Sequence, residues 1–268
     1  MKKGLRIAGI TFLYLVIYAA IVMLFNHALY NWVGDPGLKD WIIGNSGIVL
    51  IVSNIIVLAV YLPLLRWQKI SLRDLGFVPA RGGSLLLSAG TGVWLGLFIA
   101  VFTRLPWVKA TFPAISDLVA FVAGGSLIIF VLGSLLLGSL LEEWLFRGML
   151  FHTLRQRLSV QWTVLLQAVL FGAVFMNVTV GAFAALGAVV YGAVRAGSQS
   201  LWGSLAAHVC STGTLYIVLQ RAGDWQSGTL GLLAAISGLG IAAHVLLLLR
   251  GSGGRAKKEQ AVSNSITS

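Results

Sequence analysis

Runs of about 20 apolar residues alternate with short polar segments along most of this chain. Each run is close to the ~20 residues that a helix needs to cross the hydrocarbon core of a bilayer. Their approximate bounds are 7–26, 42–65, 83–103, 119–146, 161–178, 180–196, 201–219 and 228–249. The pattern therefore predicts an all-α polytopic membrane protein in which about eight transmembrane helices form a bundle.

The composition agrees with this class. Of 268 residues, 58% are hydrophobic and only 10% are charged, and the mean hydropathy is +0.91. A soluble core of this size cannot hide so much apolar surface. Residues 251–268 differ, because they are rich in Gly, Ser and charged residues and have no apolar periodicity. We therefore predict one membrane-embedded domain, 1–250, followed by a disordered cytosolic tail, 251–268.

The basic residues predict the orientation of the bundle. With eight spans both termini lie on one side, and 15 of the 19 basic residues fall on that side. Cytosolic loops carry such an excess of Lys and Arg, so both termini are expected in the cytosol of a multi-pass plasma-membrane protein. Loops beside anionic lipid headgroups account for the net charge of +11, and no nucleic-acid partner is predicted.

One apolar run contains charged residues that invite a functional explanation: Glu142, Glu143 and Arg147. On a helix, Glu143 and Arg147 are four apart and should form an ion pair. Glu142 lies in line with Ser134 and Gly138, a small polar stripe suited to facing the bundle interior. Each charge at such depth costs on the order of 3 kcal/mol, which favours a functional site. The alternative is that these residues only join helices or lie at a cytosolic helix end.

A second polar stripe lies in the seventh predicted span. Ser204, His208, Thr212 and Tyr216 recur every four residues, so they share one face of a helix. This face is expected to line a cavity. His244, alone in the last span, is expected to be a hydrogen-bonded structural group.

Three motifs together resemble the CPBP family, the CAAX proteases and bacteriocin-processing enzymes also called the Abi family. Glu142 to Gly148 matches the family motif Glu-Glu-x-x-x-Arg. The connector from Leu72 to Phe77 resembles its Arg-Asp-Leu-Gly loop, and Leu201 to His208 resembles the approach to its last motif histidine. The similar region covers about residues 69–215.

The resemblance implies an intramembrane endopeptidase with a cytosol-facing cavity, acting on a membrane-associated peptide or protein tail. In this reading Glu142 is the general base that activates a water, Glu143 and Arg147 form the supporting pair, and His208 stabilises the oxyanion. A carboxylate shielded from bulk water can accept a proton near neutrality, and preset donors stabilise the oxyanion. No cofactor is expected. His208 with one or two carboxylates is a thin ligand set for zinc, although a divalent metal stays open as an alternative.

Two positions depart from the family pattern. Where the family has Phe-x-x-x-His, this chain has Phe171 and then Phe175, which can neither donate nor accept a proton. Losing a general acid or base typically costs ~10²- to 10⁴-fold in rate. Thr212 replaces the final Asn of the last motif and can still give one hydrogen bond. Asn177 would reach the site only through a local bulge in its helix.

Three function classes therefore stay open. The first is a family protease with an altered site. The second is a non-catalytic relative that keeps the bundle as a binding scaffold, for bacteriocin immunity or for regulation of a membrane partner. The third is a transporter or channel, which predicts internal repeats and ionisable groups spread across the bilayer. The sequence has no convincing repeat, and its ionisable residues cluster. It gives no prediction of the oligomeric state.

Overall fold

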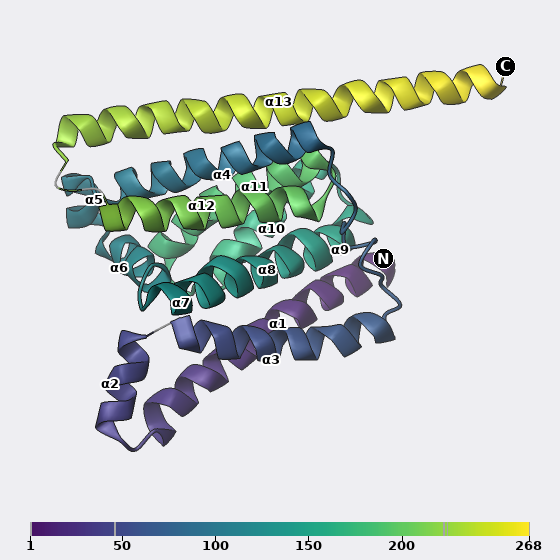
Figure 1. The fold of residues 1–268 in the computed structure, drawn as a ribbon. Coiled ribbons are helices and arrows are strands. Elements are labelled where there is room, and N and C mark those ends of the chain that lie inside the picture. The colour runs from purple at the N-terminus through teal and green to yellow at the C-terminus, as the bar shows by residue number, and fades with distance from the viewer. Residues whose placement is uncertain (1, 46, 222, 224, 268) are drawn as a thin grey trace.

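The computed structural model describes residues 2–45, 47–221, 223 and 225–267, and within them it contains helices and connecting turns but no strand. The helices pack side by side as a bundle (Figure 1). This confirms the all-α polytopic membrane fold. The helices are α1 (Lys2–Trp32), α2 (Pro36–Gly44), α3 (Gly47–Trp67), α4 (Gly82–Phe102), α5 (Pro106–Thr111), α6 (Pro113–Val122), a composite helix over Leu127–Arg155, α10 (Val160–Ala173), α11 (Val178–Ser198), α12 (Leu201–Arg221) and α13 (Ser227–Thr267).

The number of membrane crossings differs from the predicted eight. Within the described residues, six helices are long and apolar enough to cross a membrane: Gly4–Phe25, Gly47–Trp67, Gly82–Phe102, Leu127–Arg155, Val178–Ser198 and Ser227–Gly251. Helix α10 has only 14 residues, or about 21 Å. Helix α12 has 21 residues, but its polar stripe lowers its hydropathy. The count of eight is therefore not confirmed.

The predicted span 119–146 is interrupted near its start. Helix α6 ends at Val122, and Gly125 adopts a left-handed φ of 84°, which glycine tolerates and other residues rarely do. Ser126 then caps a new helix, because its hydroxyl accepts from the Ile129 amide. The charged motif consequently lies deep inside the helix Leu127–Arg155.

The C-terminal segment also differs from the expectation. The sequence predicts disorder for 251–268, whereas the backbone of α13 stays helical through Thr267. The segment contains no proline, and its Ala, Lys, Glu and Gln residues favour helix.

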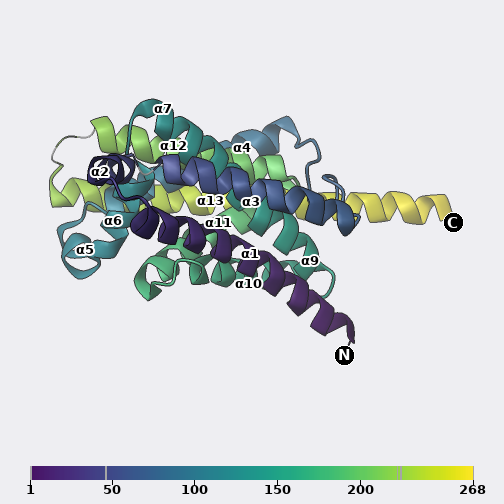
Figure 2. The same ribbon diagram turned by 90° about the horizontal axis from the view of Figure 1, so that it is seen from below.

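Both ends of the chain lie at the same end of the bundle, as Figures 1 and 2 show from two directions. The linker between α3 and α4, which carries the connector Leu72 to Phe77, lies at this end too (Figure 1). This arrangement fits the prediction that both termini share one side of the membrane.

Close helix packing places α12 against α4. A Cβ atom added to Gly92 would lie 2.0 Å from the carbonyl oxygen of Ala207, and one added to Gly96 would lie 2.2 Å from that of Ser211. Only glycine lets the two backbones approach so closely. The position of His208, Ser211 and Thr212 in the bundle therefore depends on these glycines.

Candidate active site

The helix that carries the glutamates has unusual backbone geometry. It consists of α7 (Leu127–Phe130), the π-helical segment η1 (Val131–Gly138), α8 (Ser139–Glu142), a second π-helical segment η2 (Glu143–Leu150) and α9 (Phe151–Arg155). π-helical turns are rare in proteins, and those that occur are often found at functional sites. The two adjacent glutamates lie where α8 passes into η2.

Glu143 and Arg147 form the predicted ion pair. Oε1 of Glu143 lies 3.3 Å from Nη1 of Arg147, and both side chains are 0% exposed. Nη2 of Arg147 donates to the carbonyl oxygen of Ala188 on α11 at 3.2 Å. The guanidinium carbon lies 5.1 Å from the Phe171 ring centroid and 5.2 Å from that of Tyr191. The cation is thus enclosed by one carboxylate, one carbonyl and aromatic rings.

His208 lies between the two glutamates. Its Nδ1 is 3.0 Å from Oε1 of Glu143, while its Nε2 is 3.8 Å from Oε2 of Glu142. Because a carboxylate paired with Arg147 only accepts, Nδ1 carries the proton in this hydrogen bond. The second nitrogen then faces Glu142. The ring of Tyr191 stacks on the imidazole, with centroids 4.5 Å apart and planes 16° apart.

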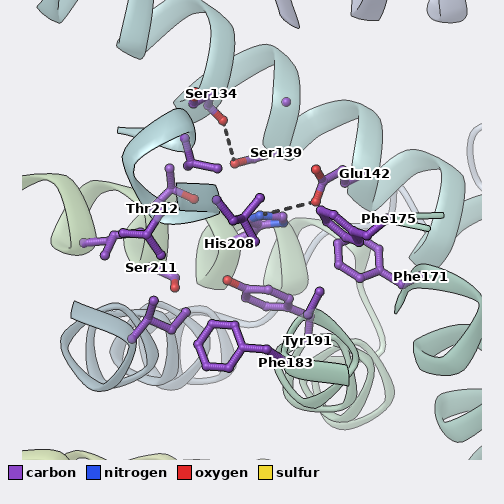
Figure 3. A pocket seen from close by; sticks show the side chains of 18 of the residues that line it. Ser134, Ser139, Glu142, Phe171, Phe175, Phe183, Tyr191, His208, Ser211 and Thr212 are labelled. Atoms are coloured by element: carbon purple, nitrogen blue, oxygen red, sulfur yellow. Dashed lines mark hydrogen bonds and ion pairs between the residues drawn. The ribbon is translucent and has the colours of Figure 1, made fainter. Parts of the chain in front are cut away.

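Glu142, His208 and Thr212 line one cavity of about 730 Å³ (Figure 3). Ser134 and Gly138 line it as well, as the predicted stripe requires. Glu142 is 28% exposed and His208 is 12% exposed, so both can meet a molecule in the cavity. Most of the wall is apolar, with contributions from α1, α3, α4, α6, α10 and α11.

The rest of the polar stripe on α12 does not belong to this cavity. Tyr216 stacks on Phe130, with centroids 4.0 Å apart, and Ser204 is buried, donating to the carbonyl of Leu201. His244 on α13 bonds the carbonyl of Gly240 in its own helix at 2.9 Å, as expected for a structural group.

Phe175, at the position of the family histidine, lines the same cavity beside Glu142 (Figure 3). Its ring packs edge-on against Phe171, with centroids 5.6 Å apart. Asn177 does not replace the missing histidine. It is exposed and forms the N-cap of α11, where its side chain accepts from the Val180 amide at 3.0 Å.

The connector before α4 is held by a local hydrogen-bonded turn. The Ser71 hydroxyl donates to the Asp74 carboxylate at 2.6 Å, and the Ser71 amide donates to it at 2.8 Å. Because these bonds favour the ionised carboxylate, they lower the pKa of Asp74 below its usual value. The turn presents Leu75, which is fully buried in the core.

Arg195 on α11 joins this connector to the glutamate helix. Its Nε donates to the carbonyl oxygen of Arg147 at 3.3 Å. Its guanidinium packs against Gly76, so that a Cβ atom added to this glycine would lie only 2.0 Å from Nη2 of Arg195. The carbonyl of Gly76 accepts from the Leu201 amide at 2.7 Å, so the connector also fixes the start of α12. Sequence reasoning did not select Arg195, because an arginine near a helix end is also explained by topology.

Sequence reasoning also missed several polar residues of the cavity. These are Tyr18, Ser53, Asn54, Ser139, Tyr191 and Ser211. They come from five different helical segments, and no spacing along the chain connects them. Among the residues that the structure describes, no group of three His, Cys, Asp or Glu side chains is placed to hold a metal ion.

Together, the helical membrane fold and the carboxylate–imidazole cluster define a polytopic membrane protein with a candidate acid–base site. Residues 124–214 match the family model described as Rce1-like, type II CAAX prenyl endopeptidase. The resemblance to the CAAX-protease family is thereby confirmed for the segment that contains Glu142, Glu143, Arg147, His208 and Thr212. Searches of curated proteins and of solved structures gave no match.

Proposed function

We propose that this protein is a membrane-embedded endopeptidase of the CAAX-protease type, which hydrolyses a peptide bond through a water activated by Glu142. One observation carries the proposal: Glu142 and Nε2 of His208 face each other across 3.8 Å in a cavity. This separation is too long for a direct hydrogen bond, and a water molecule that lies in the cavity beside the two groups can contact both.

His208 is oriented for this role by Glu143. A carboxylate that accepts from Nδ1 fixes the tautomer and leaves Nε2 toward the reacting group, as the aspartate does in Ser-His-Asp triads. The family resemblance assigns His208 to the oxyanion. The bond to Glu143 instead favours a role in orienting the attacking water, and it gives His208 part of the work of the absent histidine.

The substrate in this proposal is a membrane-associated peptide or protein tail. A cavity of about 730 Å³ with a mostly apolar wall is large enough for several side chains or for one peptide end with an apolar group. Glu142 lies inside the 29-residue membrane helix Leu127–Arg155. Because Glu142 activates the water in this proposal, the scissile bond has to enter the bundle to reach it.

A second candidate is a non-catalytic relative that binds a membrane partner in the same cavity. Phe175 favours it, because this ring occupies the position of the family histidine and faces Glu142 (Figure 3). The retained Glu142 favours the endopeptidase, because it is 28% exposed and lines the cavity, where it can meet a substrate.

The test compares the termini of membrane proteins by mass spectrometry in cells with the native protein, with Glu142→Gln or without the protein. Glu142→Gln keeps the shape of the side chain and removes its basicity. Asp117→Asn is the matched control, because Asp117 is an exposed carboxylate on α6. Cleaved termini that are found in cells with the native protein and in cells with Asp117→Asn, but not in cells with Glu142→Gln, support the endopeptidase. Identical termini in all cells would refute it and direct attention to a binding partner.

We place the protein in the plasma membrane with both termini in the cytosol, as the basic residues indicate. Single cysteines at Ser265 and Gly4 in a Cys210→Ala background test this. Membrane-impermeant thiol labelling only after permeabilisation supports the orientation, and labelling of either terminus in intact cells contradicts it.

A further inference from the structure

Tyr191 is held rigidly at the centre of the candidate site. Its ring stacks on His208 at 4.5 Å and lies 5.2 Å from the guanidinium carbon of Arg147. The residue is 7% exposed and lines the cavity. Its hydroxyl points toward Ser211 (Figure 3). A cation on one side and an imidazole on the other leave this ring little freedom to rotate.

Two hydroxyls of the same cavity, those of Ser211 and Thr212, differ from most buried hydroxyls of the bundle in their hydrogen bonding. Elsewhere in the bundle, buried hydroxyls donate to the carbonyl four residues earlier, as in Ser88, Thr91 and Thr153. Among the described residues, Ser211 and Thr212 make no such bond and instead line the cavity. Tyr191, Ser211 and Thr212 thus contribute three hydroxyls to the wall of the cavity that Glu142 and His208 also line.

Hydrolysis through Glu142 requires a donor at this place. When water attacks a peptide carbonyl, the oxygen becomes an anion, and fixed donors at that oxygen are usually the largest electrostatic contribution. His208 is committed to Glu143 through Nδ1, and Phe175 has no hydrogen to donate. The Tyr191 ring is stacked on this imidazole, so its hydroxyl is a polar group of the cavity that is held beside His208.

We propose that the Tyr191 hydroxyl is a catalytic oxyanion donor, supported by Ser211. This inference rests on the proposed endopeptidase function. In this proposal the Ser211 hydroxyl donates to the phenol oxygen, and the phenol hydrogen is left for the substrate. Each hydroxyl has one hydrogen and can also accept, so the pair satisfies itself and still presents one donor.

The reaction balances with the residues present. Water gives one proton to Glu142 as its oxygen bonds to the carbonyl carbon, and the carbonyl π electrons move to the oxygen that accepts from Tyr191. When this tetrahedral intermediate collapses, the carbon–nitrogen bond breaks. The proton held by Glu142 passes to the leaving amine, and the second product is a carboxylic acid.

The test measures the rate at which Glu142-dependent termini appear after the protein is induced, in cells with equal amounts of each variant. Tyr191→Phe keeps the ring that stacks on His208 and removes only the hydroxyl. The matched control is Tyr216→Phe, the same change on a tyrosine that packs on Phe130 outside the cavity. We expect a loss of about 10²- to 10³-fold in Tyr191→Phe, a smaller loss in Ser211→Ala and the native rate in Tyr216→Phe.

The outcomes separate this inference from the proposed function. Termini that depend on Glu142 and appear at the native rate in Tyr191→Phe overturn the inference and leave the endopeptidase intact. Absence of any Glu142-dependent terminus overturns both. A melting temperature of purified Tyr191→Phe equal to that of the native protein shows that a lost rate reflects the hydroxyl; a clear drop would mean that the residue is structural and would overturn the catalytic role.

Discussion

Nδ1 of His208 and Oε1 of Glu143 are 3.0 Å apart, although the residues are 65 positions apart in the chain. The same carboxylate oxygen lies 3.3 Å from Nη1 of Arg147. One buried oxygen therefore holds both the cation of the glutamate helix and the imidazole of α12. The geometry of the candidate site depends on Glu143 even though Glu142, and not Glu143, faces the cavity.

Replacing Glu143 should damage the fold as well as the site. Glu143→Gln leaves Arg147 buried without a counter-charge, and breaking a buried ion pair typically costs about 3–5 kcal/mol. We expect a strongly lowered melting temperature in detergent or nanodiscs. The double variant Glu143→Gln/Arg147→Met removes both charges and should recover much of the lost stability, while Glu142-dependent cleavage stays absent. If the double variant is less stable than Glu143→Gln, the buried pair is not the cause.

The sequence predicts the helical membrane fold and the central residues, because both follow from local spacing. Apolar runs identify helices, and a spacing of four identifies the pair Glu143 and Arg147. It does not predict the break at Gly125 or the short α10, because hydropathy continues across both. Nor does it predict Tyr191, which meets His208 only through the packing of α11 against α12. The spacing of four also predicts one cavity residue too many on α12, since Tyr216 packs on Phe130 instead of lining the cavity.

Restoring a histidine at position 175 should raise activity. Phe175 lines the cavity beside Glu142, so Phe175→His places an imidazole next to the reacting water. A correctly placed acid–base group typically contributes ~10²- to 10⁴-fold, and we expect at least about a tenfold gain in the rate at which Glu142-dependent termini appear.

The control for this change is Phe183→His, which introduces the same imidazole into the same cavity from α11, on the side of Tyr191 (Figure 3). It should bring no gain. A rate that is unchanged or lower in Phe175→His, with normal protein levels, would show that Phe175 does not occupy the position of a missing catalytic group.

A side chain at Gly76 is expected to be destabilising while Arg195 is present. Gly76→Ala would place Cβ 2.0 Å from Nη2 of Arg195 and would force a φ of 94° on alanine, which alone costs about 1–3 kcal/mol. We expect a lower melting temperature, and a smaller effect of the same change in an Arg195→Ala background, where only the backbone strain remains. Gly83→Ala is the control, since nothing lies within 4 Å of its added Cβ. Equal effects of Gly76→Ala in both backgrounds would contradict the contact with Arg195.

The connector turn should respond to pH through Asp74. Hydrogen bonds from Ser71 lower the pKa of this carboxyl, so the folded state favours its ionised form. The stabilisation is fully present above the ordinary aspartate pKa of about 3.9 and is lost as the pH falls through the lowered value. Asp74→Asn should therefore melt at a lower temperature than the native protein at pH 7, and the difference should shrink as the pH falls below about 4. The matched control is Asp40→Asn, the same change at an exposed carboxylate on helix α2. A difference that stays constant from pH 7 to the acid limit would mean that Asp74 acts through its shape and not through its charge.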